Sequence, residues 1–216
     1  VEKFSRLGRP QNGVWLENGI IYRNGREIMP AADIKIPGVH NIENYMAAAC
    51  ATEGLVSDAD VDAVARNFGG VEHRIELVRE VNGVKYYNDS IASSPSRTIA
   101  GLHSFSQKVI LIAGGYDKHI PFDVLGPEIC AHVKTLVLCG ATAGKIRAAV
   151  ENAPEYREGE PQILEADNLR EAVELAKNAA KPGDIVTLSP ACAAFDQFKN
   201  FAVRGKTFKE IVNSLT

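Results

Sequence analysis

The groups with the most chemical potential in this sequence stand directly after a short apolar segment. Asn88-Asp89-Ser90 is followed by the hydroxyls of Ser93 and Ser94 and by the guanidinium of Arg97. Hydroxyls, a guanidinium and the free amides of a helix start are groups with which proteins bind phosphates and carboxylates. The carboxylate of Asp89 also fits a simple helix cap. The pattern therefore predicts either an anion site or a capped helix start here.

A second group follows the apolar segment 109–113. Gly114 and Gly115 leave the backbone open to the close approach of a ligand, and Lys118 adds a mobile positive charge. The same residues also fit a plain turn followed by a solvated lysine. Both interpretations stay open from these residues alone.

Residues 139–146 are glycine-rich but do not meet the requirements of a phosphate-binding P-loop. Only three residues separate Gly140 from Gly144, where a P-loop has four. Ile146 follows Lys145, where a P-loop needs a Ser or Thr that reaches magnesium. We expect a strand-to-helix turn instead.

The segment 188–201 is rich in small residues, which permit close approach of a ligand to the backbone. Phe195, Phe198 and Phe201 recur at every third position, and this spacing predicts that at least two of them belong to a core stripe. Cys192 has no base beside it in the sequence, so we do not expect it to act as a nucleophile.

Two smaller groups lie nearer the N-terminus. Asn41 and Asn44 are three residues apart near a predicted helix start, directly after His40, and should face the same way. Capping alone could account for Asn41. His73-Arg74 stands where the pattern of the sequence changes, and clefts form at such junctions.

These groups need a scaffold, and from Arg74 onward short apolar segments alternate with helical ones. The predicted strands are 75–81, 84–87, 109–113, 135–139, 162–164 and 185–188, and the predicted helices lie near 95–105, 123–132, 143–152, 168–180 and 203–214. Apolar strands that alternate with helices favour a parallel α/β sheet covered on both faces, which binds ligands beyond the carboxyl ends of its strands. We expect Pro95 in a first helical turn and Asp167 as a helix cap.

Residues 1–72 have a different character. Asn-Gly pairs at 12–13, 18–19 and 24–25 predict a small antiparallel meander over 1–30. One helix should start near His40 and run through Thr52, and a second should open at Ser57 with a capping box to Asp60. Because this core is thin, we expect 1–72 to be the tail of a larger domain and 73–216 to be a second domain.

Composition excludes several classes of protein. The net charge is −3 with both signs interspersed, which argues against a nucleic-acid partner. The longest apolar run, 45–51, has seven residues, whereas a membrane span needs about 20. Four cysteines without metal-binding spacing predict reduced thiols in a cytoplasmic protein. We see no leader, and the missing initiator Met indicates processing or a longer parent chain.

Five segments occur in the order seen in the Mur ligases, and together they resemble that family along essentially the whole chain. They are His40-Asn41-Ile42-Glu43-Asn44, His73-Arg74-Ile75-Glu76, Asn88-Asp89-Ser90, Gly114-Gly115-Tyr116-Asp117-Lys118 and Leu188-Ser189-Pro190-Ala191-Cys192-Ala193. The later stretch 196–205 is similar to the members that add D-glutamate. The resemblance implies a Rossmann-like, mostly parallel sheet, preceded by a hairpin and helical remnant of the family's ATP-binding domain.

The resemblance also implies an activity. Such a ligase activates UDP-N-acetylmuramoyl-L-alanine with ATP and Mg²⁺ during peptidoglycan synthesis, and D-glutamate attacks the resulting acyl phosphate. This chain would be the amino-acid-binding domain, 73–216, with the end of the central domain, 1–72. The family's ATP loop and its modified, metal-holding lysine would lie upstream, so we expect the isolated chain to be inactive. The resemblance further suggests a monomer.

Family positions carry over to individual residues. Lys118, Ser93 and Phe201 match positions that bind D-glutamate. Asn44, Arg74 and Asp89 match positions around the nucleotide's base, ribose and phosphates. No metal ligand is expected in this chain.

The sequence departs from the family pattern at Ile91, often Lys, and at Ala194, often Ser. We expect Lys118 and Arg97, the hydroxyls of Ser93 and Ser94, and backbone amides to replace the missing groups. Two alternatives stay open: a ligase of this family that adds another amino acid, and a non-enzymatic α/β module that binds a small anion at 114–118.

Overall fold

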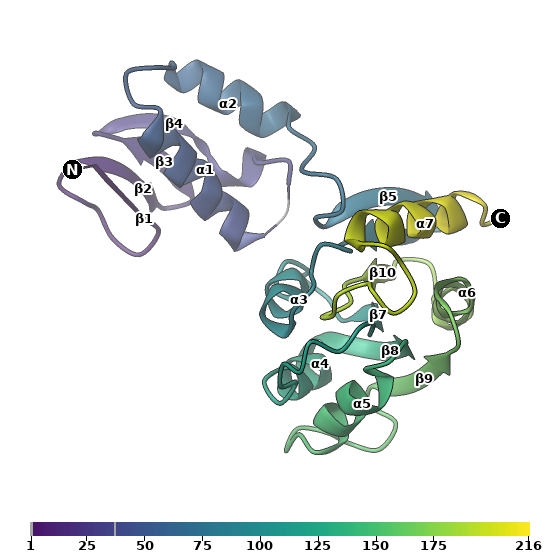
Figure 1. Cartoon of the computed structure of the whole chain (residues 1–216). Helices are drawn as coiled ribbons and strands as arrows, with labels where there is room; N and C mark the ends of the chain where they lie inside the picture. Colours follow the sequence, from purple (N-terminus) through teal and green to yellow (C-terminus); the bar gives the residue numbers. More distant parts are fainter. Residues whose placement is uncertain (1, 37) are drawn as a thin grey trace. The chain divides into compact units, whose positions relative to one another are not determined.

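The structure is a computed structural model that describes residues 2–36 and 38–216. The chain divides into two compact units, residues 1–70 and 71–216 (Figure 1). Each unit has its own hydrophobic core. Among the described residues, no helix is long and apolar enough to cross a membrane.

The first unit combines a four-stranded sheet with two helices. Its elements are β1 (Lys3–Ser5), β2 (Gly13–Glu17), β3 (Ile20–Arg23), β4 (Arg26–Pro30), the 3₁₀ turn η1 (Ala31–Asp33), α1 (Val39–Ala51) and α2 (Asp58–Asn67). Strands β2, β3 and β4 are antiparallel neighbours, and Asn18 and Asn24 adopt the positive φ values that their tight turns require. These three strands confirm the predicted hairpins.

The expected antiparallel meander is wrong for its first strand, because β1 pairs with β2 in parallel. Asn12-Gly13 does not form a hairpin turn. Gly13 instead opens β2 with a φ of 124°, and a side chain there would collide with the Lys3 carbonyl, 1.9 Å from an added Cβ. Its amide donates to Asn24 Oδ1 at 2.7 Å. The glycine therefore serves the close approach of β1.

The predicted start of α2 is confirmed in detail. Ser57 is its N-cap, the Ser57 side chain accepts from the Asp60 amide, and the Asp60 carboxylate accepts from the Ser57 amide. This reciprocal pair satisfies two of the amides that a helix start leaves without partners. The pKa of the Asp60 carboxyl is lowered by hydrogen bonds that it accepts from the Ser57 hydroxyl, at 2.6 Å, and from the Ser57 amide.

The second unit is a six-stranded sheet between two layers of helices. Its elements are β5 (Glu76–Val81), β6 (Val84–Asn88), α3 (Pro95–Leu102), β7 (Val109–Ala113), α4 (Leu125–His132), β8 (Val133–Cys139), α5 (Ala143–Glu151), β9 (Gln162–Ala166), α6 (Leu169–Ala179), β10 (Ile185–Leu188) and α7 (Phe201–Asn213). The strand order is β5-β6-β10-β7-β8-β9, and β5 alone in this sheet is antiparallel to its neighbour. The predicted α/β fold with a mostly parallel sheet is confirmed.

Alternate residues of the central strands point into two separate cores. Ile110 and Ile112 of β7 pack in one core with α6 and α7, whereas Leu111 packs in the other with α3, α4 and α5. Figure 1 shows these two helix layers on opposite sides of the sheet. Because both faces are covered, every residue of β7 is apolar and buried, as is typical of a central parallel strand.

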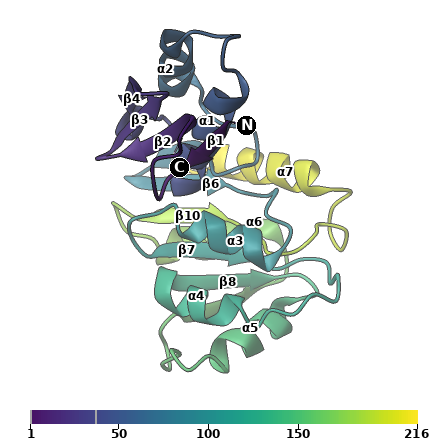
Figure 2. The same cartoon turned by 90° about the vertical axis from the view of Figure 1, so that its left-hand side faces the viewer.

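At the middle of the sheet, neighbouring strands are followed by helices on opposite faces. After β6 and β7 the chain passes to α3 and α4 on one face, whereas after β10 it passes to α7 on the other. Strand β10 lies between β6 and β7 (Figure 2). Chain segments that leave neighbouring strands toward opposite faces open a crevice at the carboxyl edge, where sheets of this kind bind ligands.

Two predicted helix starts have different outcomes. Pro95 occupies the first turn of α3 after the N-cap Ser94, as predicted. The cap of α6 is Asn168 and not Asp167, because α6 begins one residue later than expected and the Asn168 side chain accepts from the Glu171 amide at 3.0 Å. Asp167 contributes only its amide, which donates to Glu171 Oε2.

Two matched glycines test the packing of α4 against α5. Each is the second residue of its helix, but a Cβ on Gly126 would lie 2.1 Å from the Ala149 carbonyl oxygen, whereas Gly144 has open space. We expect Gly126→Ala to lower the free energy of unfolding by about 1–3 kcal/mol through overpacking. Gly144→Ala should raise it by about 0.4–1 kcal/mol, because alanine restricts the unfolded chain. Denaturant unfolding measures both, and equal effects of the two substitutions would contradict the predicted α4–α5 contact.

Candidate functional site

The polar segments singled out in the sequence gather at the carboxyl edge of the second unit's sheet. They follow β6, β10, β7 and β8, which are consecutive neighbours in the strand order. Backbone hydrogen bonds join them: the Gly114 amide donates to Pro190, the Tyr116 amide to Ala193, and the Thr142 amide to Gly115. The strand ends therefore form one continuous surface.

The glycines of this edge serve the protein's own packing. A Cβ on Gly114 would lie 2.0 Å from the Cys139 carbonyl oxygen, and one on Gly115 would lie 2.4 Å from the Ala193 carbonyl oxygen. Both glycines have positive φ values, 112° and 149°. Neighbouring loops fill the space that a side chain would need at either position, so glycine is required there by the packing of the protein itself.

A buried guanidinium ties two of these segments, those after β6 and β10, to α7. Arg204 of α7 is only 4% exposed, and its Nη2 donates to the carbonyl oxygens of Ser90 at 2.9 Å and Cys192 at 3.0 Å. Nη1 donates to the Ala193 carbonyl at 3.1 Å, and Nε donates to the Ser90 hydroxyl at 3.0 Å. Burial lowers the pKa of Arg204 to about 10, so the group stays charged at neutral pH.

Asp89 takes part in a second buried network. Its Oδ2 accepts from the Ser189 hydroxyl at 2.7 Å, and its Oδ1 accepts from the Ile75 amide at 3.3 Å. Ser189 Oγ also lies 3.0 Å from Thr98 Oγ1. Burial raises the pKa of Asp89 from 3.8 to about 7, although the hydrogen bonds from Ser189 and Ile75 act in the opposite direction. Asp89 therefore joins the ends of β6 and β10 and caps no helix.

His73 lies inside the second unit and is 4% exposed. Its Nδ1 accepts from Asn88 Nδ2 at 2.9 Å, and its ring meets Phe201 edge-on with centroids 6.0 Å apart. An added Cβ on Gly205 would lie 2.4 Å from His73 Nδ1, so α7 can approach His73 only with glycine at that position. The role of His73 in this unit is packing, and Arg74 beside it is exposed.

Lys118 and Ser93, two residues assigned to one substrate, come together at this edge. Lys118 Nζ donates to the Ser93 carbonyl oxygen at 3.3 Å, and the lysine side chain is exposed. Within the described part of the chain, no carboxylate pairs with Lys118. Lys145 is different, because its Nζ lies 2.6 Å from Asp117 Oδ2 and lowers the pKa of that carboxyl. Lys118 thus offers an ammonium group without a carboxylate partner.

The remaining assigned residues occupy two places. Phe201 begins α7 and is partly exposed, and its carbonyl accepts from the Ser90 hydroxyl at 2.8 Å. Asn44 lies in the first unit, on α1, where its Nδ2 donates to Asn41 Oδ1 at 3.3 Å, as their spacing predicts. Asn41 is not a cap, since α1 begins after Gly38.

The predicted phenylalanine stripe is wrong. Residues 191–200 form turns and no helix, so a spacing of three does not place side chains on one face. Only Phe198 packs against a core. Phe195 is 62% exposed and meets Tyr116 edge-on.

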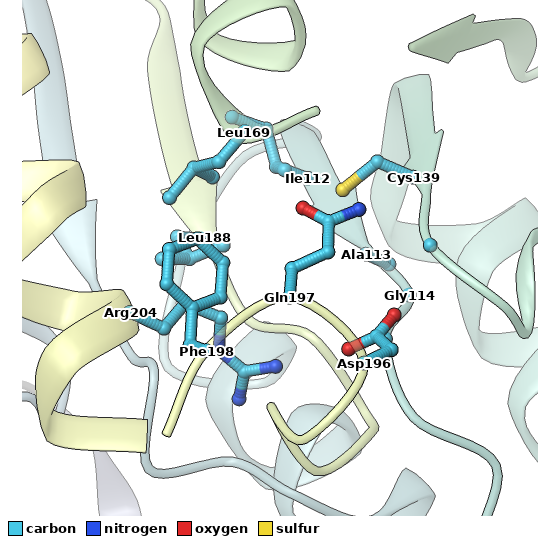
Figure 3. A pocket seen from close by; sticks show the side chains of 12 residues that line it. Ile112, Ala113, Gly114, Cys139, Leu169, Leu188, Asp196, Gln197, Phe198 and Arg204 are labelled. Carbon is cyan, nitrogen blue, oxygen red and sulfur yellow. The ribbon is translucent and has the colours of Figure 1, made fainter. Parts of the chain in front are cut away.

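A small pocket lies where this turn segment meets the strand ends (Figure 3). Asp196, Gln197 and Phe198 cover the ends of β7 and β8 there, and the Ala141 amide donates to Asp196 Oδ2 at 3.2 Å. Its volume of about 10 Å³ approaches the space that one water molecule needs. This pocket is therefore too small to hold a substrate.

The cysteines agree with the sequence analysis. All four are free, and Cys130, Cys139 and Cys192 are buried. Burial raises the pKa of the Cys192 thiol to about 11, which leaves little thiolate at neutral pH. The predicted strand-to-helix turn at 140–142 is also confirmed, between β8 and α5.

Arg204, the residue that organises this edge, was not predicted from the sequence. A signal was available, because Arg204 shares the buried stripe of α7 with Phe208, Ile211 and Val212. A charged residue on an apolar helical face marks a buried charge that must have hydrogen-bond partners. Three of its four partners are carbonyl groups, which have no side-chain signature in the sequence.

Comparisons with known proteins agree on one family. Residues 73–192 match the family described as Mur ligase, glutamate ligase domain. A UDP-N-acetylmuramoylalanine–D-glutamate ligase of Clostridium botulinum (strain Hall) is 52% identical over 215 residues, which cover 100% of this chain and 47% of that protein. The enzyme of the same name from Clostridium beijerinckii gives the same identity and coverage. The chain thus spans about half the length of these relatives.

Solved structures share the fold. A UDP-N-acetylmuramate–alanine ligase from Thermotoga maritima has a TM-score of 0.65 at 15% identity, covering 90% of this chain and 42% of that one. A folylpolyglutamate synthase from Mycobacterium tuberculosis, complexed with ADP, has a TM-score of 0.62 at 15% identity, covering 92% and 46%. At these identities the similarity concerns the fold alone.

The buried Asp89 predicts an unusual pH dependence of stability. Because its pKa rises from 3.8 to about 7 on folding, the native state holds a proton that the unfolded chain releases. This contribution is complete below the unfolded pKa and is lost as pH rises through about 7, by up to roughly 1.4 kcal/mol per pH unit. We expect Asp89→Asn, which keeps the shape, to remove it. Denaturant unfolding of both proteins across this range measures the difference, and identical pH profiles would contradict the assignment.

Proposed function

The chain belongs to the Mur ligase family, and from this premise we propose that the whole protein is an ATP-dependent ligase that adds D-glutamate to UDP-N-acetylmuramoyl-L-alanine. The support is the 52% identity to ligases with D-glutamate in their name, which extends over all of this chain. The second unit, 71–216, is the proposed glutamate-binding domain, and the first unit, 1–70, is the proposed end of the ATP-binding domain.

The observation that carries this proposal is the ammonium group of Lys118 at the carboxyl edge. It lies beside Ser93 and has no carboxylate partner among the described residues. A D-glutamate substrate has two carboxylates to be held and an amine that must stay free to attack. A fixed cation at one carboxylate performs this positioning, which converts a bimolecular attack into a local one. The proposed reaction passes through an acyl phosphate formed with ATP.

Other residues of the edge complete the proposed glutamate site. The Ser93 hydroxyl lies on the loop that Arg204 holds through Ser90, and the Ser90 hydroxyl ties this loop to Phe201, the first residue of α7. At the two positions where the family often has Lys and Ser, Ile91 and Ala194 provide neither a cation nor a hydroxyl. Ala194 is buried, and the Arg97 guanidinium donates to the Ile91 carbonyl at 3.3 Å, which brings a positive charge to that loop. We propose Arg97 as the replacement charge.

The proposed nucleotide contacts use Asn44, Arg74 and Asp89. Arg74 is exposed, and a guanidinium suits phosphate oxygens. Asp89 matches the family position near the nucleotide, and its carboxyl oxygens accept from Ser189 and Ile75. When bound, ATP with Mg²⁺ would supply the phosphoryl group. We propose that the phosphate loop and the metal ligands belong to the half of the relatives' length that this chain does not span, so the chain alone should not catalyse ligation.

Three further properties are proposed with the family assignment. These are a cytoplasmic location, a monomeric state, and small molecules instead of nucleic acid or membrane as partners. The interspersed charge of −3 supports the proposal that nucleic acid is not a partner, and the other two properties follow from the family resemblance.

Titration with the two enantiomers of glutamate tests the proposed site. NMR shifts of the chain should be larger with D-glutamate than with L-glutamate and should centre on Ser93, Lys118 and Phe201. Lys118→Ala should weaken D-glutamate binding by about tenfold or more, since a hydrogen bond to a charged group is worth about 1.5–3 kcal/mol. Lys145→Ala is the matched control, because its amine already pairs with Asp117.

Each other result has a distinct meaning. Equal binding of D- and L-glutamate would indicate a generic anion module, and preference for another amino acid would indicate a different ligase of the family. If the chain alone shows no shifts, the same variants are assayed in the full-length enzyme, where Lys118→Ala should raise KM for D-glutamate at least tenfold. An unchanged KM there would overturn the assignment of Lys118.

A further inference from the structure

Three side chains with metal-binding atoms converge on the outer layer of the second unit. His103 follows the last residue of α3, and Glu128 and His132 are four residues apart on α4. Glu128 Oε2 lies 2.6 Å from His103 Nε2 and 3.6 Å from His132 Nε2. The two imidazole centroids are 4.8 Å apart. One carboxylate oxygen therefore stands between two ring nitrogens.

We propose that His103, Glu128 and His132 form a binding site for a divalent transition-metal ion, with Zn²⁺ as the best match. The site is independent of the proposed ligase function, because none of its residues belongs to the strand-end edge. It joins the C-terminal end of α3, the end away from Ser93 and Ser94, to α4.

The chemistry of the three donors selects this class of ion. Two imidazoles and one carboxylate are a frequent ligand set for zinc, whereas Mg²⁺ and Ca²⁺ prefer oxygen alone. Positions i and i+4 on a helix, here Glu128 and His132, place two donors on one face. The three donor atoms lie within 4.8 Å of one another.

Only a small adjustment is needed to admit the ion. With bonds of about 2.0–2.1 Å in tetrahedral geometry, ligand atoms are roughly 3.4 Å apart. The distance from Glu128 to His132 is already close to this, and the distance from Glu128 to His103 must lengthen from its hydrogen-bonded 2.6 Å. The ion displaces the Nε2 hydrogen of His103 from that bond; in a neutral imidazole this proton moves to Nδ1, and in an imidazolium it is released to water, so each liganding imidazole carries its proton on Nδ1. All three side chains are partly exposed, which leaves a fourth position for water.

The electrostatic setting also favours a cation. His103 and His132 both stand at the C-terminal ends of helices, where the helix dipole contributes partial negative charge, and Lys108 Nζ already donates to the Cys130 carbonyl at the end of α4. The Glu128 carboxylate adds a full negative charge between them. The cluster thus has the charge that a divalent ion needs.

A second cluster among the described residues, formed by Glu72, His73 and Glu76, lacks this capacity. Its cation position is taken by Lys209, whose Nζ lies 3.2 Å from Glu72 Oε1 and 2.5 Å from Glu76 Oε1. His73 is also buried, and its Nδ1 accepts a hydrogen bond from Asn88. The contrast supports the His103 cluster as the metal site.

Zinc titration of the full 216-residue chain tests the proposal. Calorimetry should show one site for Zn²⁺, and Co²⁺ should give the intense visible absorption of a four-coordinate complex. His103→Gln and His132→Gln should each weaken Zn²⁺ binding by roughly tenfold or more, since even outer partners of a metal site change affinity by 10–100-fold. His119→Gln is the matched control, because that exposed histidine lies outside the cluster and should leave binding unchanged.

The outcomes separate clearly. Circular dichroism of the metal-free variants should match the original chain, which excludes unfolding as the cause of lost affinity. Zinc should raise the midpoint of thermal unfolding in the original chain and not in the histidine variants. Binding that persists unchanged in both variants would place the ion elsewhere, for example on the Cys50 thiol, and would overturn the proposal. Absence of Zn²⁺ binding to the original chain would overturn it directly.

Discussion

The buried guanidinium of Arg204 is the contact on which the strand-end surface depends. It donates to the carbonyl groups of Ser90, Cys192 and Ala193 and to the Ser90 hydroxyl. Among the described residues Arg204 has no salt bridge. The dipoles of the surrounding carbonyl groups therefore stabilise its charge in place of water. A buried charge held in this way is costly to disturb, because every lost hydrogen bond leaves a polar group without a partner. Because these hydrogen bonds are costly to break, they hold α7 against the loops after β6 and β10.

The rest of the site follows from this constraint. Because the 191–193 loop is held, it can accept the Tyr116 amide, and the 114–118 segment is placed in turn. Lys118 then reaches Ser93, which belongs to the loop that begins at Asp89. Hydrogen bonds among Asp89, Ser189 and Thr98 hold the same two loops on the face of the sheet that α3 covers. The exposed ammonium of Lys118 therefore stands on a segment whose position the held loops determine, as the proposed positioning of glutamate requires.

The fold could be predicted well from the sequence, because the signals for its strands, helices and caps are local. Alternating apolar strands and helices, the Ser57–Asp60 box and Pro95 each depend on near neighbours, and all appear as predicted. Contacts between residues far apart in the sequence could not be predicted. The parallel pairing of β1 depends on space at Gly13, and the glycines after β7 depend on loops 25 or more positions away in the sequence. The phenylalanine spacing failed because turns, not a helix, connect β10 to α7. The site residues were predicted from the family resemblance, whereas the hydrogen bonds of Arg204 could be found only in the structure.

Amide hydrogen exchange of Arg204→Met tests most directly whether this guanidinium holds the edge together. The account predicts faster exchange at Gly114 and Tyr116, whose amides donate to the 190–193 loop, and unchanged exchange within β8 and β9. Methionine keeps much of the side-chain volume, so lost packing contributes little. Unchanged protection at Gly114 and Tyr116, or an equal loss across the whole sheet, would contradict the central role of Arg204.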